Sequence, residues 1–163
     1  MKTSRKVWME LKKLGLMPEK MGDNIKFTYQ MMDCIYIQDK DDDEFFSLYV
    51  PNVFEVTEEN EYEVLKVINE CNNSLKVAKL CVNDGQLWVG AELFLQKDAT
   101  LEDLLHRSIR TMLGALMKFE YEMKGLECPL GDCVVFIGQS ALFLRRRAAF
   151  DIKSVEVPDS YAR

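Results

Sequence analysis

Hydrophobic residues near the start of the chain recur at helical spacing. Four of them fall on one stripe of a helix: Val7, Trp8, Leu11 and Leu14. Ser4 is a residue type that caps helix N-termini, and Gly15 is typical of the position just after a helix ends. The pattern therefore predicts a first helix, followed by a connection rich in proline, glycine and asparagine over residues 16–24.

The hydrophobic period then changes from helical spacing to a period of two. Residues 25–30 alternate strictly between apolar and polar, which predicts a strand. Apolar runs over residues 34–38 and 44–50 predict two more strands, and Pro51 is expected to end the last because proline cannot donate to a sheet ladder. Three strands joined by such short loops indicate an antiparallel meander.

A second helix is predicted from about Glu58 to Asn72. Its buried stripe is expected to consist of Val64, Leu65, Ile68 and Cys71. Either Thr57 or Asn60 can cap its start. Its end falls at Asn72, Asn73 and Ser74, whose side chains compete for backbone hydrogen bonds, and we expect Asn69 and Asn72 to satisfy backbone groups there.

The next segment is predicted to be a β-hairpin. Asp84-Gly85 suits a two-residue type I′ turn, in which both central residues need positive φ. This turn fixes the register, so that one face of the hairpin is apolar: Val82 opposite Leu87, Leu80 opposite Val89, and Ala78 opposite Ala91. The other face is mostly polar and carries a single large aromatic residue, Trp88.

The longest helix is predicted over residues 101–124, with Thr100 as its cap and Gly125 after its end. Beyond it, residues 133–137 look like a strand, and residues 138–150 fit either a helix, which we favour, or a second hairpin. The element order is thus helix, three strands, helix, two strands, helix. We expect a main α+β domain over residues 1–124 and a C-terminal extension over 125–163 that packs on it.

Composition narrows the class of protein. The chain has 163 residues, 48% of them hydrophobic, and a net charge of −6. An acidic chain argues against a broad nucleic-acid or anionic-membrane surface, since both need clustered positive charge. The start of the chain lacks the apolar core of a secretory signal and no later run is long enough to span a bilayer, so we expect a cytoplasmic protein.

Several of these features resemble the YbjN-like bacterial proteins. The likeness covers roughly residues 4–124 and rests on the helix end, the hairpin and the early strand: Leu65, Ile68, Asn69, Asn72, Lys79, Asp84-Gly85, Ala91-Glu92, Phe27 and Tyr29. Members of that family are described as proposed sensory transduction regulators, related in fold to type III secretion chaperones. The resemblance implies an antiparallel sheet of about five or more strands packed against helices. It also implies protein binding or regulation without catalysis, sometimes through dimers, and transfers no catalytic residue.

Sites for chemistry are sparse in the sequence. His106 is the only histidine, and Cys128 and Cys133 do not have a familiar zinc spacing, so no metal or cofactor is expected. A Cys128–Cys133 pair and calcium at the acidic loop 39–44 are minor alternatives. No nucleophile, phosphate-loop or hydrolase motif occurs, so we expect that the protein is not an enzyme.

Two features favour binding to another protein or to a second copy of the chain. Trp88 lies on the non-core face of the hairpin, where Lys79 and Glu92 are expected to form an ion pair. We expect Trp88 to be exposed there; the alternative is that the C-terminal segment covers this face. Arg145, Arg146 and Arg147 form a basic cluster suited to an acidic partner, an anionic ligand or the acidic loop of the chain itself. If the protein associates, we expect it to use the exposed sheet face or the surface of the second helix rather than this cluster. A small-ligand sensor or enzyme with a pocket between sheet and helices is the alternative function.

Overall fold

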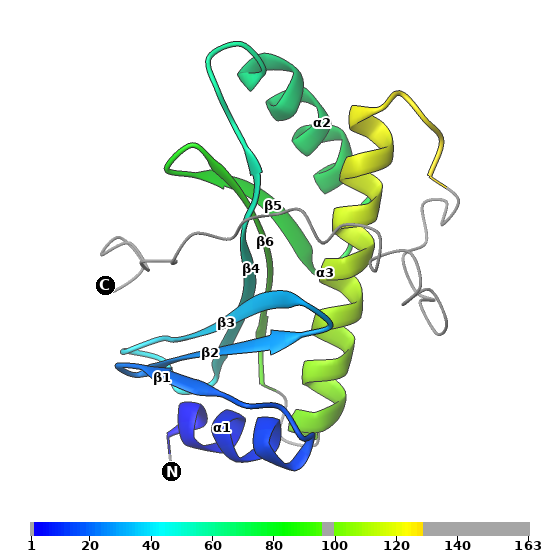
Figure 1. Cartoon of the computed structure of the whole chain (residues 1–163). Helices are drawn as coiled ribbons and strands as arrows, with labels where there is room; N and C mark the ends of the chain where they lie inside the picture. Colours follow the sequence, from blue (N-terminus) through cyan, green and yellow to red (C-terminus); the bar gives the residue numbers. More distant parts are fainter. Residues whose placement is uncertain (1, 96–99, 129–163) are drawn as a thin grey trace.

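A computed structural model describes residues 2–95 and 100–128 of the chain. Its elements are α1 (Thr3–Lys13), β1 (Glu19–Met21), β2 (Asn24–Tyr29), β3 (Met32–Gln38), β4 (Phe45–Glu55), α2 (Glu61–Ser74), β5 (Ala78–Asn83), β6 (Gln86–Phe94) and α3 (Leu101–Met123). The strands form one antiparallel sheet in the order β1-β2-β3-β4-β6-β5 (Figure 1). The α+β architecture and the predicted order are confirmed, with β1 as an extra short strand in the segment predicted to be a connection.

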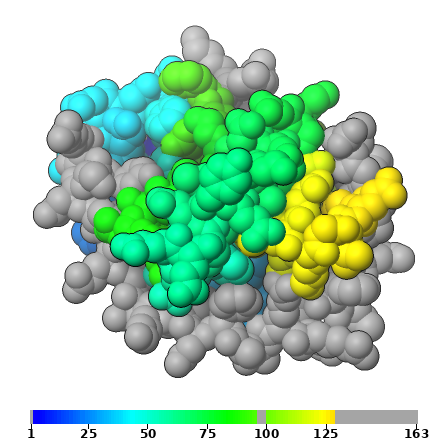
Figure 2. Space-filling model, turned by 90° about the horizontal axis from the view of Figure 1, so that it is seen from above, coloured from blue at the N-terminus to red at the C-terminus, as the bar shows by residue number. Residues whose placement is uncertain are grey.

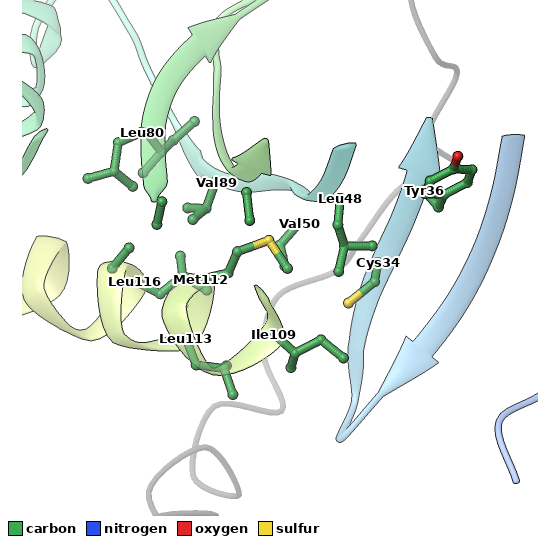
Figure 3. Packing of buried hydrophobic residues seen from close by; sticks show 14 of the residues in the cluster. Cys34, Tyr36, Leu48, Val50, Leu80, Val89, Ile109, Met112, Leu113 and Leu116 are labelled. Atoms are coloured by element: carbon green, nitrogen blue, oxygen red, sulfur yellow. The ribbon is translucent and has the colours of Figure 1, made fainter. Parts of the chain in front are cut away.

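All three helices contribute to one core against the same face of the sheet. The long helix α3 runs along this face, and α2 lies beside the C-terminal part of α3 (Figures 1 and 2). Side chains of α3 interdigitate there with alternate residues of the strands (Figure 3). The centre of this packing is fully buried, as at Met112, Leu48 and Val89, each 0% exposed. A core of this size stabilises the fold mainly by removing apolar surface from water.

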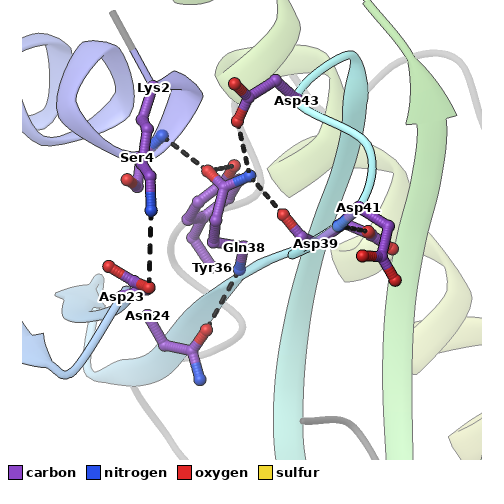
Figure 4. Close-up of polar contacts among 9 residues, drawn as sticks. All are labelled: Lys2, Ser4, Asp23, Asn24, Tyr36, Gln38, Asp39, Asp41 and Asp43. Atoms are coloured by element: carbon purple, nitrogen blue, oxygen red, sulfur yellow. Dashed lines mark hydrogen bonds and ion pairs between the residues drawn. The ribbon is translucent and has the colours of Figure 1, made fainter. Parts of the chain in front are cut away.

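Helix α1 is joined to the sheet by a polar network centred on Gln38 (Figure 4). Gln38 Oε1 accepts hydrogen bonds from the Ser4 backbone N–H at 2.8 Å and from the Tyr36 hydroxyl at 3.0 Å. The Gln38 N–H donates to Asn24 Oδ1 at 3.0 Å. The prediction that Ser4 caps the helix is wrong: the helix begins at Thr3, and a strand residue satisfies the N–H of Ser4 instead.

Strand β4 is longer than predicted. It continues through Pro51 to Glu55, and its register against β6 shifts between Val50 and Phe54. Asn52, inside this irregular stretch, has a positive φ of 51°. Proline is tolerated here because a bulge already interrupts the ladder and removes the need for its N–H.

The hairpin of β5 and β6 has the predicted turn and register. Both central residues have positive φ, 48° at Asp84 and 68° at Gly85. The apolar pairs Val82–Leu87, Leu80–Val89 and Ala78–Ala91 lie opposite one another. The Val56 N–H donates to the Gly85 carbonyl at 2.7 Å, which joins the turn to the segment before α2.

Replacing Gly85 with valine should lower the free energy of unfolding by about 1–3 kcal/mol, because a β-branched residue is strained at positive φ. A Cβ at this position would also lie 3.4 Å from the Val56 carbonyl oxygen. Chemical denaturation measures the loss. Gly85→Asn is the matched control, since asparagine tolerates this φ and should lose less stability. Equal losses in both variants would contradict the conformational argument.

Helix α2 differs from the prediction on its buried side. Val64, Val67, Ile68 and Cys71 face the core, whereas Leu65, predicted to be buried, is 47% exposed. At the end of α2, the expected role of Asn72 is confirmed. Asn72 Oδ1 accepts from the Leu80 N–H at 2.9 Å, and Asn72 Nδ2 donates to the Leu80 carbonyl at 3.0 Å.

The predictions for the C-terminal part mostly lie outside the described residues. These are the strand over residues 133–137, the helix or hairpin over 138–150, and the basic cluster. Within the described part, the capping of α3 is confirmed, since the Asp103 N–H donates to Thr100 Oγ1 at 3.2 Å.

Candidate functional site

The structure brings Lys79 and Glu92 together across the β5–β6 hairpin, as predicted. Lys79 Nζ lies 2.7 Å from Glu92 Oε2, and the two side chains are 64% and 25% exposed. A third residue, missed in the sequence, completes the group: the Tyr49 hydroxyl on β4 donates to the other oxygen of Glu92. Strand β4 pairs with β6 although α2 and β5 separate them in the chain, so no local pattern signals this contact.

A glycine makes room for the Tyr49 side chain. Tyr49 and Lys79 flank Gly90 in register on the two neighbouring strands. A Cβ placed on Gly90 would lie only 2.4 Å from Tyr49 Cε1, so the tyrosine ring lies directly over this glycine. Gly90 therefore allows the ring to lie across the sheet with its hydroxyl at Glu92.

The electrostatics of this group favour a structural role. Burial by itself raises the pKa of Glu92, but hydrogen bonds from Lys79 and Tyr49 and the positive charge of Lys79 lower it by more. The net result is a pKa below the usual value for glutamate, and hence a stable carboxylate. A general acid needs the opposite shift, so the arrangement suits an ion pair that fastens β4, β6 and β5 together.

The lowered pKa of Glu92 predicts a specific dependence of stability on pH. The ionised carboxylate stabilises the fold above the unfolded-state pKa of about 4.5, and this contribution is lost as the pH falls through the lower folded-state pKa. Glu92→Gln should cost about 1 kcal/mol near neutral pH, since solvent screens the exposed Lys79. In urea denaturation at several pH values, the difference from wild type should shrink below pH 4.5. Glu63→Gln, at an exposed position of α2, is the control and should show no such change.

Trp88 lies on the predicted face of the sheet, but the prediction that it is exposed is wrong. It is 2% exposed and belongs to a second, smaller core cluster with Ile35, Ile37 and Tyr49, against which Cys81 packs. Its ring meets that of Tyr49 edge-on, with centroids 6.0 Å apart. A side chain this deeply buried offers no surface to a partner, so its large apolar area serves the fold.

The exposed apolar side chains of α2 form a different candidate surface. Tyr62 is 85% exposed and Leu65 is 47% exposed, one helical turn apart. We call these two residues the α2 patch. Figure 2 views the molecule from the side on which α2 stands in front, beside the end of α3. The surface of this helix is one of the two that the sequence favours for association, but the pattern places Leu65 in the buried stripe, because the spacing of Leu65 fits that stripe as well as that of Val67.

The described residues contain no cluster of metal-binding side chains, and burial keeps two of their thiols protonated. They contain no group of three or more histidine, cysteine or acidic side chains able to hold an ion. Burial raises the pKa of Cys34 to about 12 and that of Cys71 to about 11, which leaves both thiols protonated. In the acidic loop, Asp39 Oδ1 accepts the backbone N–H groups of Asp41 and Asp42 at 2.8 and 2.9 Å. No helix in this part of the chain is long and apolar enough to cross a membrane.

Comparison with known proteins identifies the fold. No family model and no curated protein sequence matches the chain significantly. Among solved structures, the chain is similar to YbjN from E. coli, described as a candidate transcription regulator, with a TM-score of 0.58 and 14% identity over 76% of this chain and 93% of that one. It is also similar to an uncharacterized protein from Methanothermobacter thermautotrophicus, with a TM-score of 0.55 and 14% identity over 76% and 97% of the two chains. At such identities the shared property is the fold.

Proposed function

We propose, on the premise that this chain has the YbjN-like fold, that it is a non-enzymatic protein-binding module that holds its partner on the α2 patch. The observation that carries the proposal is the exposure of Tyr62 and Leu65 on the same helix. Single exposed apolar residues are ordinary, but tyrosine is enriched among residues that dominate binding energy. An apolar pair on a stable helix gives a partner a rigid anchor at small entropic cost.

Charge around the α2 patch defines the chemistry of the partner. Residues 55–63 contain five glutamates and no lysine or arginine. None of these glutamates takes part in an ion pair within the described residues. A partner segment that combines apolar side chains with lysine or arginine would match both the patch and its acidic border. Such a segment can belong to another protein or to a second copy of this chain.

The proposal predicts that Tyr62→Ala with Leu65→Ala weakens partner binding by about 2 kcal/mol or more, typical of the loss of hot-spot side chains. Stability should change by less than about 0.5 kcal/mol, because both side chains are exposed. Capture of partners from native lysate, with identification by mass spectrometry, compares wild type with the double variant. Met17→Ala is the matched control, since Met17 is 87% exposed and lies outside α2.

Two results would count against this function. Equal recovery of the same partner by wild type and the double variant would place binding elsewhere on the molecule. If the Met17→Ala variant also fails to recover the partner, the binding would depend on exposed apolar side chains in general and not on the α2 patch. Sedimentation of the wild type and the double variant distinguishes a second copy from another protein, because only self-association changes the mass of the purified chain.

The other residues that the sequence singled out for binding contribute less to this proposal. The ion pair of Lys79 with Glu92 lies away from the α2 patch in the sequence and contributes to a partner surface only through exposed Lys79. Arg145, Arg146 and Arg147 lie outside the described residues. The proposed module needs no cofactor and acts in the cytoplasm. The alternative function, a small-ligand sensor with a pocket between sheet and helices, is favoured by one observation, a cavity beside α1.

A further inference from the structure

A cavity of about 490 Å³ lies between α1 and the β1–β2 hairpin. Its apolar part is formed by Trp8 and Met9 from the helix and by Ile25 from β2. Its charged part includes Arg5 from α1 and Lys20 from β1. A volume of this size is within the range of pockets for small organic ligands, roughly 300–1,000 Å³.

Three basic side chains lie in or beside this cavity and form no ion pair among the described residues. The ammonium groups of Lys12 and Lys20 lie 5.1 and 5.6 Å from the centroid of the Trp8 ring. No carboxylate lies within ion-pair distance of Arg5, Lys12 or Lys20 in the part of the chain that the structure describes. The chain as a whole is acidic, with 27 acidic residues against 21 basic ones. The ammonium groups of Lys12 and Lys20 near the Trp8 ring, and Arg5 in the cavity wall, therefore bring three positive charges close to one cavity.

One acidic residue, Asp23, also lines the cavity. Asp23 Oδ2 lies 3.7 Å from Lys2 Nζ, so this carboxylate already has a basic partner that is not among the lining residues (Figure 4). Asn24 also lines the cavity, and its Oδ1 accepts the Gln38 N–H. That bond fixes the orientation of the amide and leaves Asn24 Nδ2 with no hydrogen-bond acceptor among the described residues. The wall thus offers a neutral donor in addition to the cations.

From this arrangement we propose that the cavity binds a small organic anion. Its carboxylate or phosphate group is held between Arg5 and Lys20, and its apolar body lies against Trp8 and Met9. A guanidinium donates two parallel hydrogen bonds to such a group, and the ammonium groups add charge. The site is separate from the α2 patch, so the inference goes beyond the proposed function and does not depend on it.

The test uses two probes of nearly the same size and shape, the anionic naphthalene-2-carboxylate and the neutral naphthalene-2-carboxamide. Titration of ¹⁵N-labelled protein followed by NMR gives the affinity and locates each probe through the indole N–H of Trp8. The carboxylate should bind about tenfold more tightly than the carboxamide, as expected for one good charge-assisted contact. Arg5→Gln with Lys20→Gln should weaken carboxylate binding by about tenfold or more. Both positions are exposed, so the fold should persist.

A matched control removes two positive charges elsewhere, at Lys6 on α1 and Lys66 on α2, both also exposed. Lys6→Gln with Lys66→Gln should leave the affinity for naphthalene-2-carboxylate within about twofold of wild type. The proposal is overturned if both probes bind equally, or if the control variant loses as much affinity as the cavity variant. Failure of the carboxylate to shift the Trp8 indole signal at any concentration up to about 10 mM overturns it as well.

Discussion

Replacing Trp88 with alanine is expected to lower the free energy of unfolding by about 3–5 kcal/mol, the usual cost of truncating a buried aromatic residue. Trp88 is 2% exposed and belongs to a buried cluster with Ile35, Ile37 and Tyr49. The alanine variant loses this apolar burial, leaves a cavity, and removes the edge-on contact with the Tyr49 ring. Urea denaturation followed by circular dichroism measures the change, since one of the two tryptophans is lost.

The control for this variant is Tyr62→Ala, which also removes an aromatic side chain but at an 85% exposed position. Tyr62→Ala should change stability by less than about 0.5 kcal/mol. If Trp88→Ala cost no more than Tyr62→Ala, the tryptophan would be exposed in solution, as the sequence suggested. The two variants therefore separate the residue that stabilises the fold from the residue proposed to bind a partner.

Gly90→Ala is expected to cost about 3 kcal/mol, although alanine normally stabilises a strand relative to glycine by roughly 0.5–1 kcal/mol. The new Cβ would lie 2.4 Å from Tyr49 Cε1 and 2.6 Å from Tyr49 Cδ1, distances at which something must move. The Tyr49 ring is 5% exposed and confined by its neighbours. Its displacement breaks the hydrogen bond to Glu92 and the contact with Trp88 together.

A double-mutant cycle tests this explanation directly. In a Tyr49→Ala background there is no ring over residue 90, so Gly90→Ala should cost little or should stabilise the protein slightly. The coupling energy between the two positions should then reach about 2–3 kcal/mol, the upper range for residues in contact. Denaturation midpoints of the four proteins give this energy. If the stability losses of the two single variants simply add up in the double variant, Gly90→Ala destabilises the protein for a reason other than a clash with the Tyr49 ring.

Local features of the sequence predicted the local parts of the structure. The β5–β6 register follows from one turn, because Asp84-Gly85 permits the two positive φ angles that a two-residue hairpin needs. The cap of α3 at Thr100 is likewise contained in a few neighbouring residues. The prediction that Pro51 ends its strand failed because the backbone is irregular there. A bulge in β4 accommodates the proline, and the strand continues to Glu55.

Only the hairpin residues of the candidate site could be predicted, because its third strand, β4, is distant from the hairpin in the sequence. Lys79 and Glu92 follow from the hairpin register, whereas Tyr49 reaches them through the pairing of β4 with β6. The role of Gly90 depends on the same pairing. Trp88 depends on it too, since its cluster includes Tyr49 of β4 and two isoleucines of β3. Alternation assigns a residue to a face of the sheet but does not say whether that face is covered.

The two hydrogen bonds between Asn72 and Leu80 have a consequence for how other chains can approach. β5 is the last strand of the sheet among the described residues, and an unprotected last strand is a template on which a foreign strand can add, the first step toward fibrillar aggregation. At Leu80 both the N–H and the carbonyl are already bonded to the Asn72 amide. A foreign strand would have to displace this amide before it could pair there. Asn72, in the last turn of α2, thus protects this edge of the sheet at Leu80. It disfavours both aggregation through this edge and recognition of a partner by strand addition.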